Sequence, residues 1–136
     1  MYLVDTSVWI DYLRGDATRP VLALERLLAG DEIVGTAPII VQEVLQGADT
    51  DERFEKWRQY FGDLMCYPPL DSPESHIEAA RLYQACRRAG KTPRGSNDCL
   101  VARIAIEHGL VLLHDDRDFD MIGTVAGNLK LFNPVP

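Results

Sequence analysis

The apolar residues alternate along the chain between short β-prone runs and longer stretches with helical spacing. The runs that predict strands are Tyr2–Val4, Glu32–Thr36, Met65–Tyr67, Leu110–Leu113 and Leu129–Phe132. Leu110–Leu113 is the clearest of them, because a continuous aliphatic run is typical of a strand that is buried on both faces. The runs therefore predict a sheet of short strands.

Helix signals fill the stretches between these runs. The predicted helices are Val8–Leu13, about Arg19–Ala29, a helix entered at Pro38, about Asp51–Phe61, a long helix opened by Ser72 and Pro73, and one capped by Ser96. The last two carry apolar stripes, Ala79, Leu82, Tyr83 and Cys86 in the first and Leu100, Val101, Ile104 and Ala105 in the second. No helix is assigned after Leu113, where four aspartates stand within Asp115–Asp120. An EF-hand calcium loop counted from Asp116 would need Gly and Glu where Met121 and Gly127 stand, which excludes that alternative.

The alternation of strand and helix signals indicates the fold class. Strands separated by helices pair in parallel, with helices on both faces of the sheet, which is the α/β sandwich architecture. No repeat or low-complexity linker divides the 136 residues, so a single domain over residues 1–136 is expected. Ligands of such sheets bind outside the carboxyl ends of the strands. Functional side chains are therefore expected just after strands or early in the following helices.

Charge and cysteine content narrow the possible functions. A net charge of −7 argues against holding nucleic acid by bulk electrostatics, unless bound divalent cations invert the charge that a phosphate meets. The three cysteines contain no C-x-x-C pair, which argues against a disulfide framework or a zinc site and fits a reducing cytoplasm. No run approaches the ~20 apolar residues of a membrane span. We therefore expect a soluble, cytoplasmic protein.

Four carboxylates occupy the positions that this fold predicts for a site. Asp5 ends the first strand, Glu43 lies one turn into the helix after the second strand, Asp98 lies in the first turn of a later helix, and Asp116 follows the clearest strand. Taken singly, Asp5 and Asp98 could simply serve helix N-termini, and the other two could be solvated. Converging carboxylates ~4 Å apart would repel by ~4 kcal/mol at an effective dielectric of about 20, so together they need cations. Oxygen ligands select hard ions such as Mg²⁺ or Mn²⁺, which support phosphodiester cleavage.

Four segments resemble VapC-type PIN-domain toxins, in order and spacing over essentially the whole chain. They are Val4–Asp11 (VDTSVWID), Val41–Val44 (VQEV), Asn97–Ala102 (NDCLVA) and Leu112–Phe119 (LLHDDRDF). The resemblance implies a PIN-like three-layer α/β/α sandwich around a short, mostly parallel sheet. It also implies an endoribonuclease, the toxin of a type II toxin–antitoxin pair, with an RNA substrate, an antitoxin protein partner and commonly a toxin homodimer. The residues it implies for catalysis are Asp5, Glu43, Asp98 and Asp116, with Mg²⁺ or Mn²⁺ on the three aspartates and Asp118 close by.

Two residues beside these acids carry secondary predictions. Thr6 could orient Asp5 or hold a water near the metal, and it could also serve as a capping hydroxyl. His114 stands where many members of the resembled family carry Thr. We favour a hydrogen-bonded structural role over a general base for His114, because a metal-activated water needs no imidazole.

Basic residues gather in one part of this acidic chain. The range 79–96 contains no acidic residue and has a charge of +5, from Arg81, Arg87, Arg88, Lys91 and Arg94. Basic residues at a helix C-terminus could interact favourably with the helix dipole, and this explanation fits Arg87 and Arg88. Lys91 and Arg94 lie past the expected helix end, so they are predicted to hold RNA phosphates.

Three other functions stay open on the sequence. They are an aspartyl-phosphate phosphatase with Asp5 as nucleophile, a PIN-type nuclease of housekeeping RNA processing, and a binding module that has lost its chemistry. The phosphatase needs a second Asp two residues after the first, and Ser7 occupies that position. The presence of all four acids argues against the inactive module.

Overall fold

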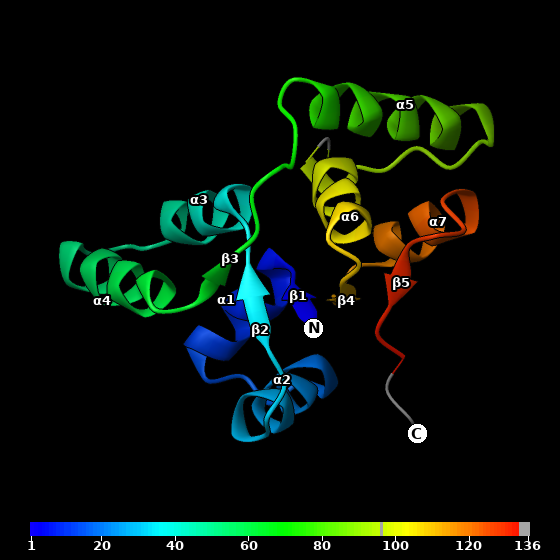
Figure 1. Cartoon of the computed structure of the whole chain (residues 1–136). Helices are drawn as coiled ribbons and strands as arrows, with labels where there is room; N and C mark the ends of the chain where they lie inside the picture. The colour runs from blue at the N-terminus through cyan, green and yellow to red at the C-terminus, as the bar shows by residue number, and fades with distance from the viewer. Residues whose placement is uncertain (96, 134–136) are drawn as a thin grey trace.

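A five-stranded sheet forms the centre of the computed structural model, which describes residues 1–95 and 97–133 (Figure 1). The strands are β1 (Tyr2–Val4), β2 (Val34–Thr36), β3 (Met65–Cys66), β4 (Val111–Leu113) and β5 (Lys130–Leu131), in the order β3-β2-β1-β4-β5. The five predicted strands are confirmed, four of them slightly shorter than expected. Leu3 of β1 lies opposite Gly35 of β2 and Leu112 of β4. All four pairings in the described residues are parallel.

Helices cover both faces of this sheet. Those in the described residues are α1 (Thr6–Arg14), α2 (Arg19–Ala29), α3 (Pro38–Gln46), α4 (Asp51–Gly62), α5 (Glu74–Arg88), α6 (Asn97–Glu107) and α7 (Arg117–Val125). The chain steps from β1 through β2 to β3 in one direction, then crosses back to β4 and β5 beyond β1. Because parallel crossovers are right-handed, this reversal puts α1–α4 on one face and α5–α7 on the other. Figure 1 shows the same two groups of helices, which confirms the predicted three-layer α/β/α sandwich.

Helix α7 corrects the prediction that no helix follows Leu113. Its N-cap is Asp116, whose side chain accepts a hydrogen bond from the backbone N–H of Asp118. Phe119 and Ile122 are buried at helical spacing on its inner face. The run of aspartates resembles a solvated loop, but acidic residues in a first turn also favour a helix N-terminus. The second effect holds here.

Side-chain caps fix where several helices begin. Asp5, Thr18 and Thr50 cap α1, α2 and α4 by accepting hydrogen bonds from backbone N–H groups of the first turn. Helix α1 ends at Gly15, whose φ of 81° is sterically free only for glycine. The predicted cap Ser96 lies outside the described residues. The Asp5 cap joins β1 to α1 without a loop, so the Asp5 side chain is held at the strand end.

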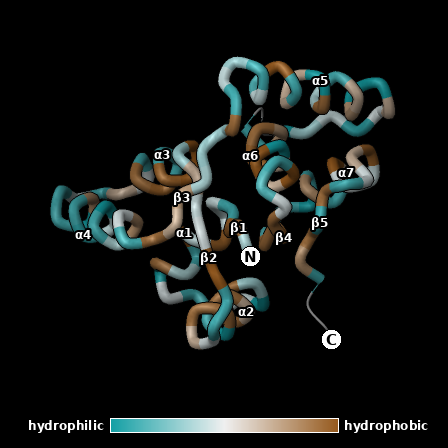
Figure 2. The backbone as a smooth tube through the Cα atoms, in the orientation of Figure 1, coloured by the Kyte–Doolittle hydropathy of each residue, from teal (hydrophilic) through white to brown (hydrophobic). Residues whose placement is uncertain are grey.

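Most of the large apolar side chains are buried in the core. Trp9 is fully buried and meets the rings of Tyr60 and Phe61 edge-on, with centroids 5.9 and 5.2 Å away. The stripe residues Ala79 and Cys86 of α5 are buried as predicted. Hydrophilic residues dominate α4, which lies at the outside of the molecule (Figure 2). Trp9 is therefore a core residue rather than a platform for RNA bases.

Two further observations concern cysteines and membranes. The free thiols are Cys66, Cys86 and Cys99, of which only Cys66 is exposed. Burial raises the pKa of Cys99 to about 12, so its thiol is unreactive at neutral pH. None of the helices in residues 1–95 and 97–133 combines the length and apolar character that crossing a bilayer requires.

Candidate active site

The carboxyl ends of β1 and β4 lie side by side at the point where the strand order reverses. Asp5 follows β1, and its backbone N–H donates to the carbonyl oxygen of Leu113 at the end of β4, 2.9 Å away. Asp116 lies three residues beyond Leu113. The chain leaves β1 for one face of the sheet and leaves β4 for the other, which opens a crevice between the two departing segments. The predicted acids therefore lie where this fold binds its ligands.

Asp5 is held rigidly by the first turn of α1. Its Oδ2 accepts hydrogen bonds from the backbone N–H of Ser7 at 3.3 Å and from the Ser7 Oγ at 2.8 Å. The residue is only 6% exposed. Burial raises the pKa of Asp5, and the hydrogen bonds from Ser7 oppose this rise. The carboxylate is thus both a helix cap and an acid of the site, and Ser7 orients it through two hydrogen bonds.

Glu43 lies on the same side of the site, on the inner face of α3. Its Oε1 accepts a hydrogen bond from the Oγ1 of Thr6, 3.0 Å away. Burial raises the pKa of Glu43, hydrogen bonds from Thr6 and Asn97 oppose the rise, and the nearby charge of Asp5 adds to it. Thr6 therefore orients Glu43, a contact that the sequence did not predict. Asn97 is a further neighbour that sequence reasoning missed.

Three aspartates converge on the other side of the site. Asp98 of α6 and Asp116 and Asp118 at the start of α7 each offer an oxygen, and these oxygens lie within 4.8 Å of one another. Asp118 is only 2% exposed, so it is the most buried acid of the three. The sequence placed Asp118 merely close by. A sequence signal for its place in this group is the D-x-D spacing across the start of α7. This spacing brings the N-cap residue Asp116 and the first-turn residue Asp118 to the same point.

The charges of the four other acids all affect the pKa of Asp98. Burial raises its pKa to about 7, and the charges of Asp5, Asp116, Asp118 and Glu43 add to the rise in that order. Asp5 lies outside the group of three converging oxygens, yet its charge is the second largest cause. Gly95 leaves room for Asp98, because a Cβ there would lie 3.3 Å from the carboxylate Oδ2. The five carboxyl groups thus form one electrostatic unit.

The two predicted phosphate-binding residues lie in different surroundings. The Arg94 guanidinium contacts the site itself, with Nε 3.4 Å from Asp118 Oδ2 and Nη2 3.4 Å from Asp116 Oδ1. The Lys91 Nζ donates instead to the Thr124 Oγ1 at 2.9 Å, which ties the loop after α5 to α7. Arg94 is thus part of the acidic centre, and Lys91 anchors the loop beside it.

His114 bears on the choice between a structural role and a general base. Its Nδ1 accepts a hydrogen bond from the backbone N–H of Asp116 at 3.2 Å, and its Nε2 lies 3.5 Å from Asp120. The ring is also 5.3 Å from that of Phe119. These contacts support the structural role, because His114 braces the turn that presents Asp116.

The donor set fits a hard divalent cation. All the converging atoms are carboxylate oxygens, the ligands that such ions select. Burial is the largest cause of the raised pKa of Asp98, and the charges of the four other acids add to it, so a bound cation would favour the ionised form of this carboxyl. The residues that could hold the ion are Asp98, Asp116 and Asp118, with Asp5 adjacent.

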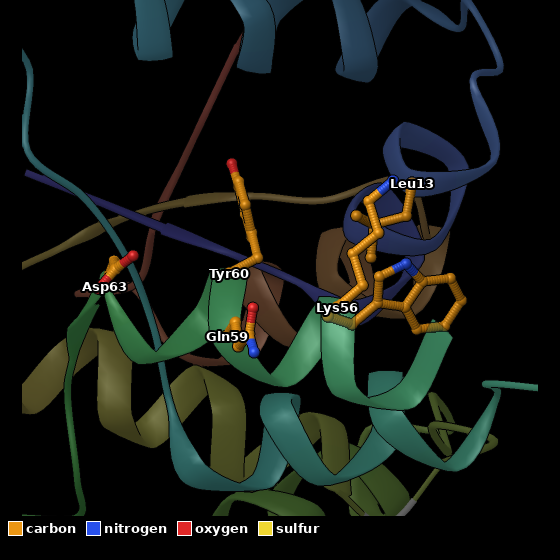
Figure 3. Close-up of a pocket in the computed structure, with 6 residues that line it drawn as sticks. Leu13, Lys56, Gln59, Tyr60 and Asp63 are labelled. Carbon is orange, nitrogen blue, oxygen red and sulfur yellow. The ribbon is translucent and has the colours of Figure 1, made fainter. Parts of the chain in front are cut away.

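One hollow of the surface lies away from these acids. It lies between α1 and α4, where Figure 3 shows the side chains of Leu13, Lys56, Gln59, Tyr60 and Asp63. None of the five site carboxylates lines it, so this hollow is not part of the acidic centre.

Comparisons with known proteins agree with this geometry. The PIN domain family matches residues 2–124. Ribonuclease VapC11 of Mycobacterium tuberculosis is 36% identical over 129 residues, which cover 93% of this chain and 94% of that protein. Ribonuclease VapC51 of the same organism is 35% identical over 93% of this chain and 88% of its own length. A solved structure of VapBC2 from Rickettsia felis, bound to a promoter DNA fragment, shares the fold with a TM-score of 0.75 and 20% identity, covering 98% of each chain. The chain belongs to the PIN-domain family, among the VapC ribonucleases.

Proposed function

We propose that the chain is a Mg²⁺- or Mn²⁺-dependent endoribonuclease that cleaves RNA phosphodiester bonds at the five-carboxylate centre. The observation that carries the proposal is the convergence of Asp98, Asp116 and Asp118 beside Asp5, at the strand ends where this fold binds ligands. The membership of the VapC ribonucleases supports the same activity. No comparable support exists for the phosphatase alternative, since Ser7 occupies the position of its second acid and donates hydrogen bonds to Asp5.

The proposed roles follow from the contacts of each acid. Asp98, Asp116 and Asp118 hold the ion, and Asp5 adds a carboxylate from the β1 side. A bound Mg²⁺ or Mn²⁺ supplies Lewis-acid stabilisation of the charge that develops on the phosphate and makes a water easier to deprotonate. Glu43 lies at the rim of the group, where the hydrogen bond from Thr6 to Oε1 holds its carboxylate in position to accept a proton from that water.

An acidic protein also needs positive charge where the substrate approaches. The loop after α5 places the Arg94 guanidinium on the acidic centre and anchors Lys91 to Thr124 of α7. We propose that these two residues contact phosphates on either side of the scissile bond. Their charges, together with the bound cation, offset the net −7 of the chain at the one place where RNA must bind.

Partners are the second part of the proposal. We propose an antitoxin protein partner that silences the enzyme. This proposal is supported by the similarity of the fold to a chain of a toxin–antitoxin complex from Klebsiella pneumoniae, with a TM-score of 0.69 over 99% of this chain and 98% of that chain. A cytoplasmic homodimer is also proposed. Its support is a groove between α3, α5 and α6 lined by Pro38, Ile39, Leu100 and Ile104, a surface that a second copy could cover. Sedimentation of the purified chain measures the dimer, and cleavage assays after co-expression with a candidate antitoxin measure the inhibition.

The activity is tested with purified protein and a labelled RNA. We expect cleavage with Mg²⁺ or Mn²⁺, none in EDTA, and a loss of at least about a hundredfold in Asp98→Asn, because the substitution removes a proposed ligand of the ion. The matched control is Asp115→Asn, which makes the same chemical change at an exposed acid outside the converging group. Full cleavage in EDTA, or equal losses in both variants, would contradict the proposed centre.

A further inference from the structure

Arg94 is tied to the acidic centre in two different ways. Its backbone N–H donates to Asp118 Oδ2 at 3.0 Å, and its guanidinium spans Asp118 and Asp116 with both distances at 3.4 Å. Charge-assisted bonds between such groups are normally 2.7–2.9 Å. The backbone bond therefore fixes the loop, whereas the guanidinium rests on the two carboxylates at the outer limit of hydrogen bonding.

The exposure of the partners shows which of them can move. The Arg94 side chain is 70% exposed, whereas the Asp118 side chain is 2% exposed. The carboxylates form the floor of the site, and the guanidinium covers them from the solvent side. A long, exposed side chain can swing away without disturbing the backbone bond that holds the loop.

The guanidinium and a divalent cation need the same oxygens. Asp116 Oδ1 and Asp118 Oδ2 are the atoms that face Arg94, and both residues belong to the group of three aspartates that converges on one point. Two positive groups on one pair of carboxylates repel each other. Among the ion pairs of the described residues, only those of Arg94 reach this group of aspartates.

We propose that Arg94 is an internal counter-ion of the metal-free centre, which competes with the divalent cation for Asp116 and Asp118. The inference rests on the proposed function, because it takes this centre as the place of the ion. Its consequence is that Arg94 sets the cation concentration at which the enzyme becomes active. The guanidinium leaves the two carboxylates when the ion binds.

The experiment is a calorimetric Mn²⁺ titration of the full chain at about 0.15 M salt, in wild type and Arg94→Ala. Removing a competing charge should tighten Mn²⁺ binding by about fivefold, the upper range for an exposed ion pair. Lys91→Ala is the matched control, because it removes the same charge from the same loop but its partner is Thr124. Its Mn²⁺ affinity should change by less than about twofold, since distant exposed charges are screened.

A second measurement covers the stability of the variant. In EDTA, Arg94→Ala should unfold at a lower temperature than wild type, because the aspartates lose their counter-ion, and saturating Mn²⁺ should remove this difference. Arg94→Gln, which keeps a polar side chain with an N–H donor but removes the charge, serves if the alanine variant does not fold. Unchanged or weaker Mn²⁺ binding in a folded Arg94 variant would overturn the inference.

The result also separates this inference from the proposed function. If wild type binds Mn²⁺ and Asp98→Asn does not, the centre is the ion site, and the Arg94 variants alone decide the question of competition. If Asp98→Asn binds Mn²⁺ as well as wild type does, the ion lies elsewhere, and both the proposed centre and the role of Arg94 are wrong.

Discussion

The two sides of the acidic centre are stabilised by different means. On the β1 side, Asp5 and Glu43 are oriented by the neutral hydroxyls of Ser7 and Thr6, at 2.8 and 3.0 Å. On the α7 side, aspartates converge on one another and are covered only by a loosely held guanidinium. The hydroxyl side has its geometry before any cation arrives, because its donors belong to the fold. On the aspartate side, the Arg94 guanidinium is the positive group that contacts the converging acids before a cation arrives.

The largest effect expected from this difference is a pH dependence of stability that comes from Asp98. Its folded pKa of about 7 lies above the ordinary value of 3.8, so between these pH values the folded protein binds more protons than the unfolded chain. In EDTA, the stability contributed by protonated Asp98 should therefore be present at low pH and lost as pH rises through about 7. Urea unfolding at about pH 5 and about pH 7.5, one value below and one above the folded pKa of Asp98, measures the loss.

The matched variant for this test is Asp98→Asn, which removes the titration. After discounting for the solvent screening of this half-buried carboxyl, we expect Asn to stabilise the metal-free protein by about 1–2 kcal/mol at the higher pH and by little at the lower pH. The same pH slope in wild type and variant would show that the crowding of charge on the aspartate side costs no stability.

A smaller effect is expected from the hydroxyl side. Thr6→Val removes the hydrogen bond to Glu43 and keeps the shape of the side chain, so cleavage should fall about tenfold, as for other groups that orient a functional side chain. Thr6→Ser restores the hydroxyl and should recover most of the activity. Mn²⁺ affinity should change little in either variant, because the ion lies on the other side. A loss of Mn²⁺ binding in Thr6→Val would contradict the independence of the hydroxyl side from the aspartate side.

The smallest effect concerns the double role of Asp5. Asp5→Asn and Asp5→Ala both remove the charge, and both should lose cleavage. Asparagine can still accept hydrogen bonds at the start of α1, so the alanine variant should be less stable than the asparagine variant by about 1 kcal/mol. Thermal unfolding in EDTA compares the two directly. Equal stabilities would mean that the bonds from Ser7 do not support the helix.

The strands and the layers of the fold could be predicted from the sequence because they depend on periodic patterns. The aliphatic run in β4 and the apolar stripes of the helices are local signals, and the structure places these elements as expected. The position of Asp5 and Asp116 followed from the rule that ligands bind at strand ends. These are properties of residue order, which the sequence contains in full.

Contacts between side chains from distant segments could not be predicted in the same way. Asp118 was expected near the site and is its most buried member, and this burial depends on α7, a helix that was not predicted. Arg94 was predicted to face RNA, and nothing in the sequence indicated that its guanidinium would lie on Asp116 and Asp118. Both depend on how the loop after α5 meets α7, which is decided by tertiary packing.

The parallel pairing of β1 with β4 has a consequence for the cell that makes this protein. The ribosome produces β1 and Asp5 before the neighbouring strand β4 and before the acids Asp116 and Asp118. A nascent or prematurely terminated chain that stops before β4 therefore lacks the central strand pair and two of the five acids. Such incomplete translation products should not cleave RNA, because the proposed centre forms only when β4 and the start of α7 have been made.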